Sequence, residues 1–106
     1  MRFSHAPLVI VVVAVLDRDD DKIPKRERLL TVGCVCFALL QAAQALGFGA
    51  QWLTGWPAHD RGVRDILGLK PQERVAGFIH IGTPRKDAPE RSRPDVRDLL
   101  SDWQAP

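Results

Sequence analysis

The stretch AAQALGFGAQWLTGWPA, residues 42–58, decides the fold of this chain because it carries three structural signals in order. Helix-forming Ala, Leu and Gln residues end at Gly47, and glycine is the residue preferred just past the C-terminus of a helix. Gly47 and Gly49 permit a tight turn, and residues 50–55 (AQWLTG) predict a short strand after it. The stretch therefore predicts a helix that turns directly into a strand.

The segment before this turn predicts a long helix. Residues 29–59 contain no Asp, Glu, Lys or Arg, and residues 29–46 (LLTVGCVCFALLQAAQAL) are rich in helix formers. Apolar residues lie on every side of this helix, which is typical of a helix buried all round or one in lipid. Its length would allow a membrane span, but Gln41, Gln44 and the stop at Gly47 disfavour one. We expect a central core helix of the kind that lies in a subunit interface.

An apolar run near the N-terminus predicts a buried strand. Residues 6–16 read APLVIVVVAVL, and a short β-branched run of this kind suits a strand covered on both faces. A secretory signal peptide, with Arg2 as its charged region, is the alternative interpretation. Such a peptide ends in small residues at a cleavage site, whereas this run ends in Val15 and Leu16 followed by Asp17. The buried strand is therefore the preferred interpretation.

The C-terminal half predicts one more helix and one more strand. Asp60 can cap a short helix that runs to Leu67, with Gly68 just past its end. Residues 74–81 (RVAGFIHI) predict an apolar strand, and a further short helix is expected within residues 96–103. The order of elements predicts an α+β fold, in which a small three-stranded sheet packs on the long helix. The order of the strands within the sheet does not follow from the sequence.

Length and composition are those of one soluble domain. The chain has 106 residues, of which 45% are hydrophobic and 26% charged, close to the globular average. Fifteen basic and 13 acidic residues give a net charge of +2, which is too even for electrostatic capture of nucleic acid. We expect one cytoplasmic domain over residues 1–106, with residues 85–106 as an extended tail and with no nucleic-acid or membrane partner.

Residues able to carry side-chain chemistry are scattered. Cys34 and Cys36 are two positions apart on the expected helix, so they point in nearly opposite directions and are expected to be structural thiols. His5, His59 and His80 lie on separate elements without metal-ligand spacing, although His80 faces away from its apolar neighbours on its strand. No catalytic triad, P-loop or zinc motif occurs in the sequence. We therefore expect no catalytic side chain and no metal site.

Five segments follow one another along the chain: APLVIVVV, KIP, QAAQALGFGAQWLTGWPAHD, GLKPQERVAGFIHIGTP and ERSRPD. In this order they resemble the nitroreductase family, in its short, single-domain branch of NAD(P)H-dependent FMN flavoproteins. The resemblance covers residues 6–103 and is most specific over residues 42–58. It implies a partial nitroreductase-like fold, since family members are nearly twice this long and the chain resembles only their C-terminal half. The Arg-rich segment that grips the FMN phosphate in the family belongs to the other half.

The resemblance also implies candidate cofactor residues. Trp52, Leu53 and Thr54 match the family strand that lines FMN. Leu53 stands where some relatives have arginine, which leaves the backbone of that strand to contact the flavin. A second segment matches the part of the family assigned to the nicotinamide cofactor; it consists of Ala42, Ala43, Gln44, Ala45, Leu46 and Gly47.

The function implied by the resemblance is that of an oxidoreductase. NAD(P)H would reduce FMN, and the flavin would pass electrons to a nitroaromatic or quinone-type acceptor in a homodimer with FMN at the subunit boundary. Because the flavin carries the chemistry, no side-chain nucleophile is required. The alternative is a catalytically incomplete fragment of the fold that acts only as a dimerisation or assembly partner. A third hypothesis, a small membrane or secreted protein, rests on the two apolar runs.

Overall fold

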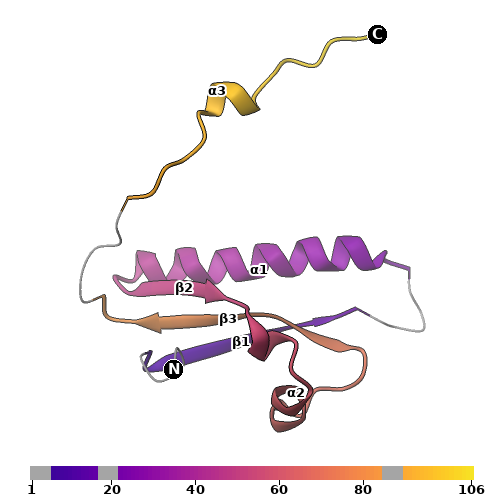
Figure 1. Ribbon diagram of the computed structural model, residues 1–106, viewed down its shortest axis with the longest axis vertical. Helices are drawn as coiled ribbons and strands as arrows, with labels where there is room; N and C mark the ends of the chain where they lie inside the picture. The colour runs from indigo at the N-terminus through magenta and orange to yellow at the C-terminus, as the bar shows by residue number, and fades with distance from the viewer. Residues whose placement is uncertain (1–5, 17–21, 85–89) are drawn as a thin grey trace.

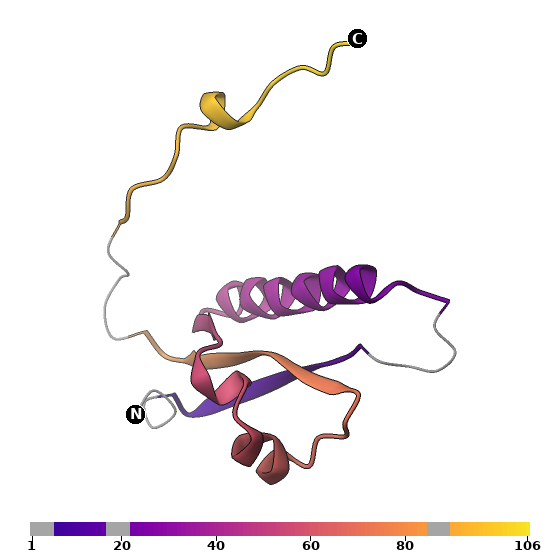
Figure 2. The same ribbon diagram turned by 45° about the vertical axis from the view of Figure 1, so that its right-hand side comes forward.

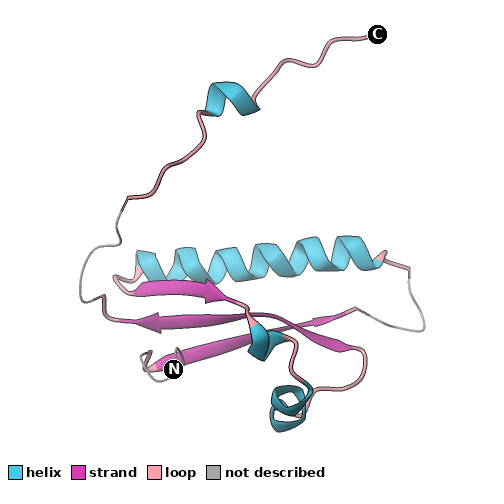
Figure 3. Ribbon diagram, viewed as in Figure 1, coloured by secondary structure: helices cyan, strands magenta, loops and turns pink. Residues whose placement is uncertain are grey.

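A three-stranded antiparallel sheet carries one long helix along one face and shorter helical turns on the other (Figures 1 and 3). This computed structural model describes residues 6–16, 22–84 and 90–106. The elements are β1 (Leu8–Val15), α1 (Lys25–Ala45), β2 (Gly49–Leu53), the 3-10 helix η2 (Trp56–Ala58), α2 (Arg61–Leu67), β3 (Glu73–Gly82) and α3 (Val96–Leu99). The expected α+β fold is confirmed.

The last strand occupies the middle of the sheet, in the order β1-β3-β2. Both neighbours run antiparallel to β3, so the first strand of the chain becomes one edge and β2 becomes the other. The pairing of β1 with β3 shifts between Val12 and Val13, and Ala76 of β3 has no partner in the register. A shift of this kind is a β-bulge, which leaves one residue outside the ladder.

The core lies on both faces of the sheet. Between α1 and the sheet, Val12, Cys36 and Ile79 form a buried cluster. On the opposite face, Ala58 of η2 packs with Val75 and Phe78 of β3. Strand β1 contributes alternate residues to both clusters, which confirms that its unbroken apolar run is that of a strand covered on two faces.

Within a single chain, the long helix is not buried all round. One stripe of α1 packs on the sheet and only Cys36 and Ala43 are buried, whereas the side chains of Leu30 and Phe37 are 62% and 57% exposed. The sheet is a single layer and covers one side of the helix (Figure 2). From Leu29 onward, the outer side of α1 is therefore an uncovered face without charged residues.

Within the described part of the chain, α1 is also the one helix long and apolar enough to cross a membrane by length and composition. A core helix of a soluble protein passes the same test. The inner stripe of α1 packs on a sheet in this structure.

The two ends of α1 follow local signals. The helix begins at Lys25, earlier than the uncharged run suggests, because the carbonyl of Pro24 accepts hydrogen bonds from the first-turn N–H groups of Glu27 and Arg28. At the other end Gly47 has a φ of 91°, in the left-handed region. The N–H of Phe48 donates to the carbonyl of Ala43, and that of Gly47 donates to Gln44, both at 3.0 Å. These two bonds form a Schellman motif, which turns the chain into β2 as the sequence predicted.

Helix α2 begins after Asp60 and ends before Gly68, the two positions that the sequence predicted as its caps. The Asp60 carboxylate accepts a hydrogen bond from the Val63 N–H at 3.0 Å, and Gly68 ends the helix with a φ of 71°. We expect Asp60→Ala to lower the free energy of unfolding by about 1 kcal/mol, because an N–H of the first turn loses its acceptor. Urea denaturation measures this change. Asp65→Ala removes a charge from the same helix without removing the cap, so equal losses in both variants would contradict the capping role.

Candidate functional site

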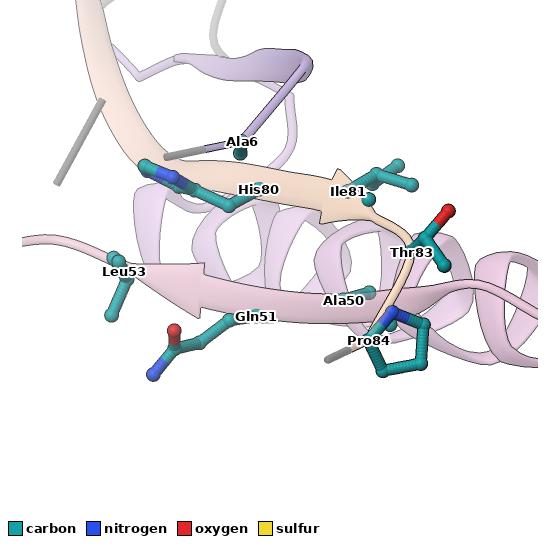
Figure 4. A pocket seen from close by; sticks show the side chains of 10 residues that line it. Ala6, Ala50, Gln51, Leu53, His80, Ile81, Thr83 and Pro84 are labelled. Carbon is teal, nitrogen blue, oxygen red and sulfur yellow. The ribbon is translucent and has the colours of Figure 1, made fainter. Parts of the chain in front are cut away.

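An open groove of about 630 Å³ runs along strands β2 and β3 near the start of β2 (Figure 4). Gln51 pairs with His80, and Leu53 pairs with Phe78, so these side chains share one face of the sheet. Phe78 belongs to the cluster beneath η2, which identifies this face as the one turned away from α1. The lining residues are Ala6, Gly49, Ala50, Gln51, Leu53, His80, Ile81, Gly82, Thr83 and Pro84.

The two strand residues expected at the flavin point to opposite faces of the sheet. Leu53 lines the groove, whereas Trp52 pairs with Ile79 and lies on the α1 side. The indole Nε1 of Trp52 donates a hydrogen bond to the carbonyl of Ala76 at 3.2 Å. That carbonyl belongs to the bulged residue, so the indole satisfies a group that the bulge takes out of the register. The side chain of Trp52 therefore anchors β2 to β3.

The indole ring of Trp52 also depends on the glycine beneath it. A Cβ atom built on Gly77 would lie 2.1 Å from Nε1 and 2.4 Å from Cδ1 of Trp52. No side chain fits between the ring and the central strand at this point. Gly77 is thus required for the position of Trp52.

The segment expected at the nicotinamide cofactor forms the last turn of α1 and its cap. Of the residues 42–47, Ala43 is a buried residue of α1 and the others are exposed. None of them lines the groove, and neither does the exposed Thr54 just after β2. The turn at Gly47 leads directly into β2, so only residues 48–51 separate the two expected segments along the chain, although they do not share one cavity. Of the nine expected residues, Leu53 is the one that lines the groove.

Sequence reasoning missed two polar groups of the groove. His80 is buried, with 8% of its surface exposed, and its register partner Gln51 lies beside it on β2. The alternation of His80 with Ile79 and Ile81 does indicate that it faces away from the helix, and the structure confirms this. Nothing in the sequence around Gln51 marks it, because its place opposite His80 depends on the pairing of β2 with β3.

The backbone of β2 offers a second kind of contact. As the edge strand next to β3, β2 has N–H and C=O groups on its outer side that take no part in the ladder. Such an edge alternates hydrogen-bond donors and acceptors, so a planar heterocycle with a similar alternation can bind along it. The edge and the groove together make β2 the candidate ligand-binding element.

The thiols do not belong to this site. Cys36 lies on the inner side of α1 and is fully buried against Val12 and Ile79 of the sheet. Burial raises the pKa of its thiol, which keeps the thiol protonated and unreactive. Cys34 is exposed on the outer side of the helix. The expected opposite orientation of the two cysteines is confirmed. In the described ranges, no group of three or more His, Cys, Asp or Glu residues could hold a metal ion.

Comparison with known proteins finds one family throughout. The profile of the Nitroreductase family matches residues 2–83. The chain is 37% identical over 84 residues to "Putative NAD(P)H nitroreductase YdjA" of Escherichia coli strain K12, which covers 79% of this chain and 45% of that protein. It is 36% identical over 98 residues to a "Putative NAD(P)H nitroreductase" of Haemophilus influenzae, covering 92% of this chain and 53% of that protein.

Among solved structures, the chain superposes on a nitroreductase-like family protein from Bacillus cereus with a TM-score of 0.84 at 22% sequence identity. That superposition covers 98% of this chain and 55% of the other. The chain therefore spans about half the length of the curated relatives it matches.

Proposed function

The chain belongs to the nitroreductase family and has part of the nitroreductase fold, and we propose from this premise that it contributes to an FMN-dependent NAD(P)H oxidoreductase. The acceptor would be a nitroaromatic or quinone-type compound. The observation that carries the proposal is the edge strand β2, which borders a groove of ligand size on one face.

The residues of the groove suit a flavin ring. The pyrimidine edge of the ring alternates hydrogen-bond donors and acceptors, as does the outer edge of β2. Leu53 supplies an apolar surface for the ring, and Gln51 supplies an amide that can both donate and accept. The hydrogen bond from Trp52 to Ala76 holds β2 in register while the ring binds. When bound, the flavin supplies the hydride and electron transfer.

The phosphate of FMN requires positive charge or backbone amides. Among the described residues, no Lys or Arg lines the groove. Arg91 and Arg93, which match the ERxRPD segment of the family, lie in the exposed tail. We therefore assign the phosphate anchor to a group outside the described lining of the groove.

The nicotinamide cofactor is assigned to residues 42–47. This segment lies at the end of α1, one turn before β2, so a dinucleotide held there would lie next to a flavin bound along the strand.

The proposed assembly is a homodimer through the outer face of α1, located in the cytoplasm. We do not assign α1 to a membrane, because its inner stripe packs on the sheet.

The test is flavin binding by the purified chain. We expect visible absorbance of bound flavin after FMN is added in excess and the unbound part removed, followed by turnover with NAD(P)H. Leu53→Asp should raise the FMN dissociation constant about 10-fold or more, because it removes an apolar contact with the ring and desolvates a carboxylate against it. Leu67→Asp, on α2 and outside the groove, is the matched control.

A colourless protein would instead favour the alternative, an incomplete fragment that acts as an assembly partner. That alternative is favoured by one observation, the match to only about half the length of the relatives. In that case, addition of the remaining half of a relative should restore flavin binding. If neither the chain nor the mixture retains flavin, the proposed function is wrong.

A further inference from the structure

A second cavity lies away from the groove, between α2 and the start of β3 (Figure 1). It has a volume of about 330 Å³ and shares no described lining residue with the groove. From Arg74 to His80 the strand β3 rises about 20 Å, at about 3.3 Å per residue, so the two sites lie toward opposite ends of this strand. This cavity, called the arginine cavity, is lined by Arg61, Arg64, Asp65, Leu69, Pro71 and Arg74.

Three arginines from two elements meet at the arginine cavity. Arg61 and Arg64 are three positions apart on α2, so they share one face of this helix. The connection from α2 to β3 closes with a hydrogen bond from the Glu73 N–H to the Lys70 carbonyl at 2.9 Å. This turn reverses the chain and places Arg74, at the start of β3, on the same cavity.

One backbone carbonyl holds two of the guanidinium groups together. Nη2 of Arg64 donates a hydrogen bond to the carbonyl of Glu73 at 3.2 Å, and Nη1 of Arg74 donates to the same carbonyl at 2.9 Å. A carbonyl is a neutral acceptor, so these contacts orient the side chains and leave their charges in place. A guanidinium that is already oriented loses less entropy when it binds an oxyanion.

The charges around the arginine cavity are unbalanced. Of its described lining residues, three are arginines and Asp65 is the one acidic residue. The carboxylate of Glu73 accepts a hydrogen bond from the Lys70 N–H at 2.7 Å. The Nε–H of Arg64 is buried and has no acceptor among the described residues, which is costly for a charged group. An oxyanion in the cavity supplies an acceptor once this guanidinium turns toward it.

The number of arginines favours a phosphate monoester over a carboxylate as the ligand. One guanidinium fork is enough to bind one carboxylate through two hydrogen bonds. A phosphate monoester carries up to about two negative charges at neutral pH and has three terminal oxygens, which matches three guanidinium groups. The cavity volume lies within the range of about 300–1,000 Å³ that is typical of small-ligand sites. Leu69 and Pro71 offer an apolar surface to the organic part of such an ester.

We propose that the arginine cavity is a second ligand site, which binds the phosphate of a small soluble phosphate monoester independently of the flavin. Arg61, Arg64 and Arg74 bind the three terminal oxygens, and the organic group lies against the apolar part of the lining. Asp65 repels the anion and limits the affinity. This site goes beyond the proposed oxidoreductase function and does not depend on it.

The first experiment titrates the full chain with phenyl phosphate at constant ionic strength, and calorimetry measures the dissociation constant. Arg61→Gln should raise this constant about 10-fold, because a charge-assisted hydrogen bond is lost. Arg26→Gln removes the same charge from an exposed position on α1 and should leave the constant unchanged. Equal effects of the two variants would show general charge attraction only, and either that result or the absence of binding would overturn the proposal.

The second experiment uses a gain in affinity, which a loss of folding cannot imitate. Asp65→Asn removes the repelling charge at nearly constant size, so phenyl phosphate should bind about 3-fold more tightly. Amide NMR spectra of the wild-type chain should change within residues 61–74 on binding and stay the same at Gln51 and His80 of the groove. An unchanged or weaker affinity of Asp65→Asn, or spectral changes at the groove alone, would contradict the proposal.

Two other sources of a phosphate group are separated by further measurements. If Arg61→Gln raises the FMN dissociation constant by the same factor, the cavity anchors the flavin phosphate and the proposed second site is wrong. Trp56 and Ile66 are 66% and 87% exposed on η2 and α2, so flotation with phosphatidate vesicles tests a lipid headgroup. Binding to these vesicles without binding of phenyl phosphate would identify a membrane site and would also overturn the proposal. Phenyl phosphate binding by a chain that retains no flavin would support this inference even though the proposed function had failed.

Discussion

Replacing Ala38 by glutamate should convert the proposed dimer into a monomer. Ala38 is exposed on the outer side of α1, near the middle of the helix, on a face without charged residues from residue 29 onward. Between two copies, each glutamate would lose its hydration without gaining a partner. We expect the dimer dissociation constant to rise about 1,000-fold, which corresponds to about 4 kcal/mol.

The monomer itself should keep its fold, because glutamate is a good helix former and Ala38 is exposed. Sedimentation measures the association, and circular dichroism checks the helix. Ile66→Glu is the matched control, since Ile66 is an 87% exposed apolar residue on α2. A dimer that survives Ala38→Glu at unchanged affinity would show that the outer face of α1 is not the interface.

Gly77→Ala should destabilise the folded chain by about 2–3 kcal/mol. The added methyl group would lie 2.1 Å from Trp52 Nε1, so the indole must move away from the central strand. That movement breaks the hydrogen bond to the Ala76 carbonyl and leaves this carbonyl without its side-chain donor. Because Trp52 anchors β2, the flavin affinity should fall together with stability.

A double-mutant cycle separates this clash from a general effect on the strand. In a Trp52→Leu background the methyl group has room, so Gly77→Ala should cost less than about 1 kcal/mol there. Gly33→Ala is the control glycine variant: no packed neighbour lies within 4 Å of the place its methyl group would take, and it should stabilise α1 by about 0.5–1 kcal/mol. If Gly77→Ala costs the same in both backgrounds, the contact with Trp52 is not the cause.

Much of the fold follows from local signals in the sequence. Gly47 and Gly68 mark the ends of α1 and α2, and Asp60 marks the start of α2, because each satisfies backbone groups within one turn of its own position. The unbroken run of β1 predicts burial on two faces, since successive apolar residues of a strand point to opposite sides. The family follows from the ordered segments around residues 42–58.

The site depends on features that the sequence does not contain locally. Trp52 and Leu53 are adjacent in the chain, and only the pleat of β2 sends them to opposite faces. His80 meets Gln51 because β3 lies in the middle of the sheet, a placement that depends on which strands pair over long distances. Of the two expected segments, residues 42–47 and residues 52–54, only Leu53 lines the groove, and the sequence did not distinguish it from its neighbours.

The contrast is clearest in α1. Its sequence determined a long helix without charged residues from residue 29 onward, because propensity and capping act within a few residues along the chain. Whether an apolar residue of that helix is buried depends on what lies opposite to it, and only the tertiary structure shows that one sheet covers one side. Burial is a relation between distant segments, so the helix, its ends and the family could be predicted, whereas the uncovered face and the groove could not.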